Sequence, residues 1–192
     1  IGHHAFADCA NLASVTFEEG KLTTIGEGAF EGSGLTSVVI PDTVTELGAP
    51  VNTGADGGYV FNGCKSLTEA TVGTGVTSLR ACTFASSGLR ILHLKPAEPP
   101  ALREDALDKN GIQSILVPAG AGGAYRSAWP TYYGIIFAAE EDGWFFNEDQ
   151  LVVNSDEGVT GWQKKVNPTE ITELTLGQGV KTIPAGAFAD CA

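Results

Sequence analysis

A short motif recurs along the chain at a nearly constant interval. An aliphatic residue is followed five residues later by an aromatic or second aliphatic residue, at Ile1–Phe6, Ile25–Phe30, Leu79–Phe84, Leu102–Leu107 and Ile183–Phe188. The interval from Phe6 to Phe30 is 24 residues, and the intervals from Phe61 to Phe84 and from Phe84 to Leu107 are 23 residues each. A unit of this length cannot bury its own apolar side, so neighbouring repeats must stack and share a core.

Within each repeat, a pair of apolar residues brackets a single outward position. These pairs are Val15/Phe17, Val38/Ile40, Ala70/Val72, Leu92/Leu94, Ile115/Val117 and Leu174/Leu176. This alternation predicts a short strand with one buried face, and stacked repeats align such strands into a parallel sheet. Turns are expected after the strands, at Pro41, Gly73, Pro118 and Gly177, and a helical or 3-10 turn at each Ala-Phe segment. The predicted fold class is α/β and β-dominated, with a parallel sheet on one face.

Two segments interrupt the period. The interval from Phe30 to Phe61 is 31 residues, and the excess matches a Gly-rich insert at 49–58 that we expect to be a surface loop. Residues 118–139 contain a short predicted helix at 124–129, stopped near Pro130. Their aromatic side chains are expected to cap the array, with a carbohydrate-binding surface as the alternative: Tyr125, Trp129, Tyr132, Tyr133 and Phe137.

The remainder of the chain predicts a second unit. Residues 143–154 have the pattern of a β-hairpin with a polar turn, and Trp162 is a candidate for a third strand. The repeat restarts after Ile171. We therefore expect one array with an aromatic cap at 1–139, followed at 140–192 by a hairpin linker and the first part of a second array. The first residues have no signal-peptide pattern, and we expect the chain to be a piece of a longer protein.

One stretch carries a family resemblance. Residues 25–47, IGEGAFEGSGLTSVVIPDTVTEL, resemble the BspA-type leucine-rich repeat of bacterial surface proteins, and the likeness extends over about 1–120 and 170–192. The resemblance implies a leucine-rich-repeat solenoid in a secreted or cell-surface protein that adheres to host or matrix proteins. An architectural spacer that displays another domain is the alternative.

Composition excludes several partner classes. The chain has 23 acidic and 11 basic residues and a formal net charge of −12, which disfavours nucleic-acid backbones and anionic membranes as partners. It has no run of 18 apolar residues, so direct membrane insertion is not expected. A protein ligand is the expected partner, and carbohydrate is a second class.

The residues that could support chemistry have simpler structural explanations. Cys9, Cys64 and Cys191 share one repeat position and are expected to be buried thiols, although a Cys64–Cys82 disulfide stays open. No metal-ligand spacing is present, and the acidic clusters at 140–142, 148–149 and 156–157 lack the pattern of a dedicated calcium site. The glycines at 73–78 and 177–182 are expected to form turns. We expect no enzyme activity, no cofactor and no metal.

The candidate binding residues come from strand alternation. The middle residue of each strand is expected to point outward, at Thr16, Val39, Thr71, His93, Leu116 and Thr175, with Ser14, Glu18, Ser37, Glu69, Ile91, Lys95 and Ser114 flanking them. Apolar residues at outward positions suggest a contact patch. The predicted partner-binding residues are Thr16, Val39, Thr71, Ile91, His93 and Leu116.

Overall fold

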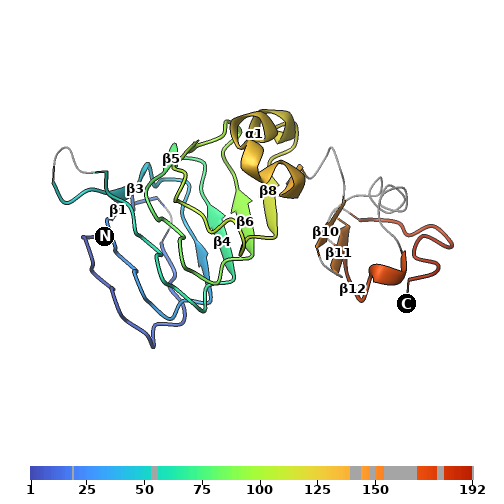
Figure 1. Ribbon diagram of the computed structural model, residues 1–192, viewed down its shortest axis with the longest axis horizontal. Coiled ribbons are helices and arrows are strands. Elements are labelled where there is room, and N and C mark those ends of the chain that lie inside the picture. The colour runs from blue at the N-terminus through green and yellow to red at the C-terminus, as the bar shows by residue number, and fades with distance from the viewer. Residues whose placement is uncertain are drawn as a thin grey trace.

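The structure, a computed structural model, describes residues 1–18, 20–52, 56–138, 144–147, 150–153, 168–176 and 180–191. Strands β1 to β9 form three sheets of parallel strands that share one core, and β10 to β12 form a separate sheet towards the C-terminus (Figure 1). Each part has its own cluster of buried apolar side chains. The predicted domain boundary at 139/140 lies outside the described residues and stays a prediction.

The largest sheet has five parallel strands, in the order β2-β4-β6-β8-β9. Their bounds are Ser37–Val39, Glu69–Val72, Ile91–Leu94, Ser114–Val117 and Ile136–Ala138. Within the repeats, the register is the one that the alternating pairs predict, because Val38, Ala70, Leu92 and Ile115 lie opposite one another. All four are buried, which confirms the inward face of β2 to β8.

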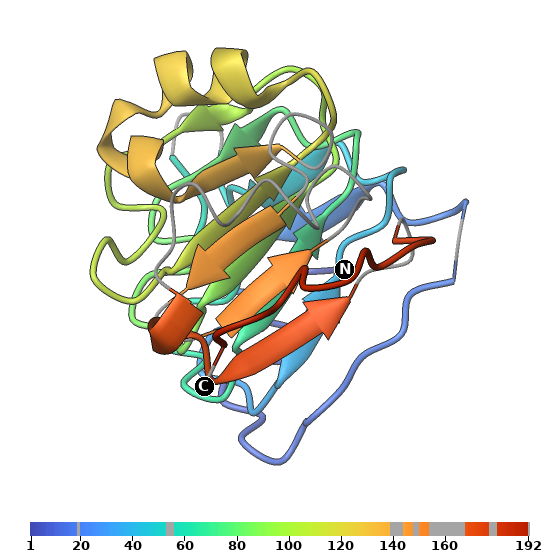
Figure 2. The same cartoon turned by 90° about the vertical axis from the view of Figure 1, so that its right-hand side faces the viewer.

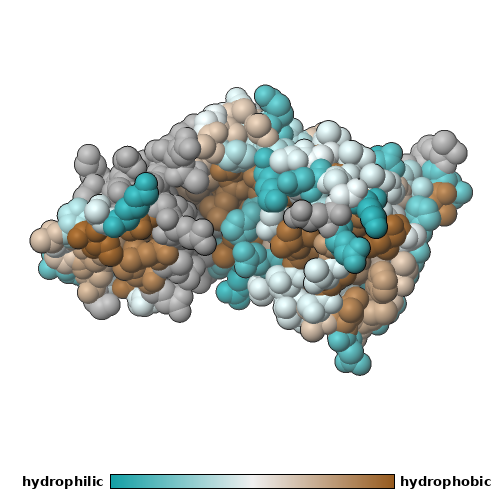
Figure 3. Space-filling model, turned by 180° about the vertical axis from the view of Figure 1, so that it is seen from behind, coloured by the Kyte–Doolittle hydropathy of each residue, from teal (hydrophilic) through white to brown (hydrophobic). Residues whose placement is uncertain are grey.

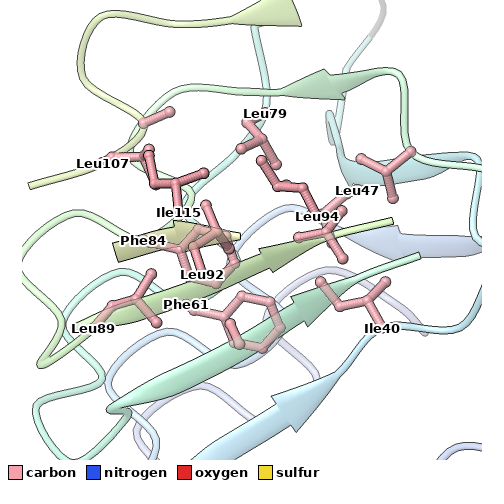
Figure 4. Close-up of a cluster of buried hydrophobic side chains, with 14 of the residues drawn as sticks. Ile40, Leu47, Phe61, Leu79, Phe84, Leu89, Leu92, Leu94, Leu107 and Ile115 are labelled. Carbon is pink, nitrogen blue, oxygen red and sulfur yellow. The ribbon is translucent and has the colours of Figure 1, made fainter. Parts of the chain in front are cut away.

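Shorter parallel pairs contribute to the same core. Strand β1 (Thr24–Gly26) pairs with β3 (Glu46–Ala49), and β5 (Ser78–Leu79) pairs with β7 (Ala101–Leu102). Ile25, Leu47 and Leu79 are buried, and Figure 4 shows Leu47 and Leu79 in the same buried cluster as Leu92 of β6. The two kinds of strand thus supply one core with apolar side chains.

A column of phenylalanines runs through the repeats. The ring centroids of Phe6 and Phe30 are 5.2 Å apart, those of Phe30 and Phe61 5.6 Å, and those of Phe61 and Phe84 5.2 Å. Each pair is stacked, with interplanar angles of 10°, 8° and 9°. The 23- to 31-residue intervals of the sequence thus place equivalent side chains directly above one another.

The Ala-Phe segments form turns, and the expectation of helical or 3-10 segments is wrong. The residues two before and two after the phenylalanine have positive φ in each of these turns: His4 and Asp8, Gly28 and Gly32, Tyr59 and Gly63, Cys82 and Ser86, Gly186 and Asp190. A left-handed residue every four positions interrupts any right-handed helix. Glycine occupies several of these places because it alone adopts that conformation without steric cost.

The aromatic segment predicted to form the cap packs against the core of the array. Helix α1 (Gly122–Ala128) and the 3-10 helix η1 (Pro130–Ile135) follow β8, and their Tyr125, Trp129 and Tyr132 side chains are buried in the main core. The Tyr125 hydroxyl donates to the Pro96 carbonyl at 2.8 Å, and Trp129 Nε1 donates to the Pro100 carbonyl at 3.1 Å. Burial raises the pKa of the Tyr125 hydroxyl. Tyr133 is exposed and does not contribute to the cap.

The predicted surface insert is partly buried. Ala49 ends β3 and is buried, and so are Gly57 and Gly58, while residues 53–55 lie outside the described residues. Gly58 packs so closely against the Ala81 backbone that a side chain at this position would collide with it. Asp56 is held by Arg103, whose guanidinium lies 2.7 Å from its carboxylate. The described residues Asp56 and Gly58 of the insert therefore contact the two repeats that follow.

The first repeat departs from the prediction, because residues 14–17 are not a strand. Val15 and Phe17 are only half-buried, and the five-stranded sheet begins at β2. Phe17 still contacts Phe30 edge-on, with ring centroids 6.2 Å apart. The side chains of this repeat thus reach the core although its backbone does not join the sheet.

The C-terminal part contains the predicted hairpin. Strands β10 (Trp144–Asn147) and β11 (Gln150–Val153) are antiparallel, and β12 (Glu173–Leu176) lies parallel to β11 after the 3-10 helix η3 (Pro168–Glu170). Leu174 and Leu176 were expected to be buried, but they are 43% and 42% exposed because β12 is an edge strand. Trp162 lies outside the described residues. None of the described helices is long and apolar enough to cross a bilayer.

Candidate binding surface

The outward side chains of the five-stranded sheet form two parallel rows. The register places Val39, Thr71, His93, Leu116 and Phe137 opposite one another on successive strands. The neighbouring row consists of Ser37, Glu69, Ile91 and Ser114. Adjacent strands of a sheet lie about 4.8 Å apart, so each row is a continuous ladder of side chains. We call the residues of these two rows the sheet face.

Most of the predicted binding residues lie on this surface. Thr71, His93 and Leu116 share the first row with Val39, which is 59% exposed, and Ile91 lies in the second row. The other four residues are half-buried, because side chains that stand side by side on a sheet cover one another in part. The structure therefore brings five of the six predicted residues onto one surface.

Thr16 is the predicted residue that does not join them. It is exposed on the non-strand segment 14–17 and lines a cleft opposite Val39. The alternation in its sequence predicts a strand, but the segment does not complete the hydrogen-bonding pattern with β2. Ser14 and Glu18, expected to flank the outward residues on this strand, are exposed on the same segment.

Ser114 contradicts the prediction in another way. It was expected to be an outward flanking residue, yet its side chain is buried and its Oγ has no hydrogen-bond partner, the only such buried side-chain atom among the described residues. The 3-10 helix η1 contacts β8, the strand on which Ser114 lies. The cap thus narrows the accessible part of the sheet face at this end.

A polar side-chain contact crosses the sheet face. His93 Nε2 lies 2.9 Å from Glu69 Oε1 of the neighbouring strand, and both side chains are partly exposed. The pair positions the imidazole between Thr71 and Leu116 in the first row. A polar contact therefore divides the two apolar ends of the row, at Val39 on one side and at Leu116 and Phe137 on the other.

Phe137 belongs to this surface and was not predicted there. Residues 118–139 have no repeat motif, and the aromatic side chains of this segment were expected to form the cap. The signal was the alternation of Ile136, Phe137 and Ala138, in which the outer two residues are buried and the middle one is half-buried on β9. The strands of the repeats show the same pattern, but β9 is not preceded by the repeat motif.

Other reactive side chains do not gather with the sheet face. Among the described residues there is no group of three His, Cys, Asp or Glu that could hold a metal ion. All four cysteines are free thiols, and the expectation of burial holds for Cys64 alone, since Cys9 is exposed and Cys82 and Cys191 are half-buried. Cys64 Sγ donates to the Phe30 carbonyl at 3.0 Å, and burial raises the pKa of its thiol. The predicted turn at 73–78 is present, whereas the acidic clusters at 140–142, 148–149 and 156–157 lie outside the described residues.

The surface of the array is mixed in character. In the view from behind, apolar side chains alternate with polar ones over the repeats and do not form a single continuous area (Figure 3). Such a mixture is typical of non-obligate protein-binding surfaces, which are about as apolar as the rest of a protein's surface.

The comparisons with known proteins identify the repeats. Residues 1–95 and 57–120 match the family described as BspA type Leucine rich repeat region, in six copies. The match confirms the resemblance over residues 1–120, and the likeness inferred for residues 170–192 stays a prediction. A comparison with curated proteins gives no significant match.

Proposed function

The chain belongs to the family of BspA-type leucine-rich repeats, and from this premise we propose that it is a protein-binding module of the cell surface or extracellular space. The sheet face binds the partner, a host or matrix protein, and the repeats form a continuous solenoid that presents it. Bacterial adhesion is the setting that the family resemblance favours. The module has no catalytic role in this proposal.

The observation that carries the proposal is the ladder from Val39 to Phe137. It places apolar side chains at solvent-accessible positions on a rigid sheet, where ordering them for binding costs little entropy. The supporting strands are fixed by a core in which Leu92 and Ile115 are fully buried. A partner can therefore bury Leu116 and Ile91 without rearrangement of the backbone.

Binding to immobilised extracellular-matrix proteins and glycans tests the proposal. Ile91→Asp and Leu116→Asp place a charge on the sheet face, and a partner that buries the face should bind at least tenfold more weakly, since an unpaired buried charge is costly. Val51→Asp is the matched control, because Val51 is an exposed apolar residue in the insert and not on the sheet face. Equal affinity of all three variants and the parent protein would discard the sheet face as the site.

The architectural spacer is the second candidate. It is favoured by the polar residues Ser37, Glu69 and Thr71, which lie beside Val39 on β2 and β4 of the sheet face. A spacer requires no ligand, so it predicts that no matrix protein or glycan binds to the folded chain. A ligand that binds the parent protein and does not bind Leu116→Asp would exclude the spacer hypothesis.

A further inference from the structure

A cleft opens beside the sheet face, between the first repeat and β2. One wall is formed by residues 14–17 and Gly20, the other by residues 37–39 and 41–43, and Lys95 lies at one end. Its volume is about 610 Å³, which is within the range of about 300–1,000 Å³ found for ligand sites. Figure 2 shows the first repeat, in dark blue, running apart from the light-blue strand of the next repeat. We call this opening the strand cleft.

The strand cleft is closed at both ends by hydrogen bonds. At one end the Thr36 N–H donates to the Ala13 carbonyl at 3.1 Å. At the other end the Thr43 hydroxyl donates to the Leu22 carbonyl at 2.7 Å, and pairing of the two repeats resumes from there. The opening is therefore a bounded gap within the stack and differs from a frayed end.

The length of one turn explains why the gap is present. In the first repeat, four residues separate Phe17 from Leu22. The turn at the equivalent place in the next repeat has only three, between Ile40 and Val44. The first repeat thus has one more residue at this place than the next repeat, and residues 14–17 stand away from β2 between the hydrogen bonds at the two ends.

The backbone of β2 has unused hydrogen-bonding groups in the strand cleft. Alternate residues of a parallel strand bond to opposite neighbours, and Ile40 N–H donates to Thr71 of β4 at 2.8 Å. Ser37 and Val39 therefore direct their N–H and C=O groups away from β4 and towards residues 14–17. Within the described part of the chain, these groups of Ser37 and Val39 have no hydrogen-bond partner.

The other lining groups are neutral as a set. Val15, Phe17, Val38 and Pro41 contribute apolar surface. Among the described residues of the lining, Asp42 is the one that is acidic, and Lys95 Nζ lies 3.3 Å from its carboxylate. The two charges neutralise each other, so the strand cleft favours an uncharged occupant.

We propose that the strand cleft receives an extended, uncharged segment of a partner protein, which adds a strand to the free edge of β2. Main-chain groups of that segment pair with Ser37 and Val39, whose spacing along the strand, about 6.8 Å, is matched by every second residue of another extended chain. Apolar side chains at alternating positions pack against Phe17 and Val38. The inference rests on the proposed function in that the partner is a protein, and it adds the form that the partner takes.

A blocked peptide with the sequence Thr-Val-Thr-Val-Thr is a suitable probe. In the free protein, amide hydrogen exchange measured by NMR should be fast at Ser37 and Val39 and slow at Val38 and Ile40, which are paired with β4. Saturating peptide should slow exchange at Ser37 and Val39. Two further peptides carry N-methyl groups on alternate residues, one on the odd and one on the even positions. At least one of them should bind about tenfold or more weakly than the parent peptide, because two hydrogen bonds are lost.

Two variants separate backbone pairing from side-chain contact. Val39→Pro removes the N–H that points into the strand cleft and leaves the pairing with β4 intact, so it should weaken peptide binding. Val39→Thr keeps the N–H and the branched shape, so it should retain binding. Should Val39→Pro fail to fold, the N-methylated peptides still decide the question.

Three results would overturn the inference. The first is slow exchange at Ser37 and Val39 without peptide, which would mean that residues 14–17 themselves pair with β2. The second is a peptide that leaves exchange unchanged, and the third is equal binding of the parent and both N-methylated peptides. Leu116→Asp should leave peptide binding to the strand cleft unaltered. A failure of the strand cleft to bind the peptide is therefore distinguishable from a failure of the sheet face to bind a matrix protein.

Discussion

The stacked phenylalanines allow a quantitative test of how the repeats are held together. Phe61 is fully buried and stacks on two neighbours, Phe30 at 5.6 Å and Phe84 at 5.2 Å. Among the described residues, Phe6 stacks on Phe30 alone, and it is 40% exposed. Replacing either ring by leucine keeps most of the apolar volume and removes the ring–ring contacts. Each such contact contributes about 1 kcal/mol beyond burial.

Phe61→Leu should therefore lower the free energy of unfolding by about 2 kcal/mol, since two ring contacts are lost. Phe6→Leu should lower it by about 1 kcal/mol, since one is lost. Urea unfolding followed by circular dichroism gives both values, provided that the dependence on urea concentration is the same for each variant. Phe61→Ala should cost more than Phe61→Leu, about 3–5 kcal/mol, because it also leaves a cavity.

The test compares the loss of unfolding free energy in Phe61→Leu with that in Phe6→Leu. A Phe61→Leu change that costs no more than Phe6→Leu would mean that the stacked rings do not couple neighbouring repeats. The same conclusion would follow if both changes fell within about 0.5 kcal/mol of the parent protein, the range of ordinary surface substitutions.

Three further predictions concern the turns, one carboxylate and the thiols. Gly63→Ala should destabilise the protein by about 1 kcal/mol and Ser86→Gly should stabilise it, because both positions have positive φ. Thermal unfolding measures both effects, and an unchanged stability of Gly63→Ala would contradict the turn geometry. The Thr74 N–H and Lys95 lower the pKa of Asp42 from 3.8, so this carboxylate stabilises the fold above that pH and loses its contribution as the pH falls through the lowered value. The stability difference between Asp42→Asn and the parent should disappear in acid, and a difference that grows there would refute the assignment. Cys9 should react with a thiol reagent in the folded protein and Cys64 only after unfolding; equal rates would contradict the burial of Cys64.

The sequence predicted the architecture best where the same pattern recurs. Alternation at Val38/Ile40, Ala70/Val72 and Leu92/Leu94 determines which side of each strand is buried, and the repeat interval determines the register. Neighbouring repeats reinforce one another, because each supplies the surface on which the next is buried. The column from Phe6 to Phe84 follows from the same rule.

The prediction failed where a residue's environment depends on its neighbours in space. Val15 and Phe17 show the strand pattern, but residues 14–17 form no strand beside β2. Leu174 and Leu176 show it as well, yet they lie on an edge strand and remain exposed. In the first case local alternation did not ensure hydrogen-bonded pairing, and in the second it did not ensure burial, although β12 pairs with β11.

The candidate binding surface was predicted in part for the same reason. Val39, Thr71, His93 and Leu116 align because their strands are regular, whereas Ser114 is buried on β8, the strand that η1 contacts. Phe137 joins the surface through a strand that no repeat motif precedes. The positive φ values of Tyr59, Cys82 and Ser86 could be inferred only by comparison with glycines at the same repeat positions.

The central claim is that consecutive repeats lie directly above one another and share one core. Nuclear Overhauser contacts between selectively labelled phenylalanine rings measure this most directly. Phe61 should show ring contacts to both Phe30 and Phe84, with none between Phe30 and Phe84. Missing contacts from Phe61 to its two neighbours, or a direct contact between Phe30 and Phe84, would contradict the stacking.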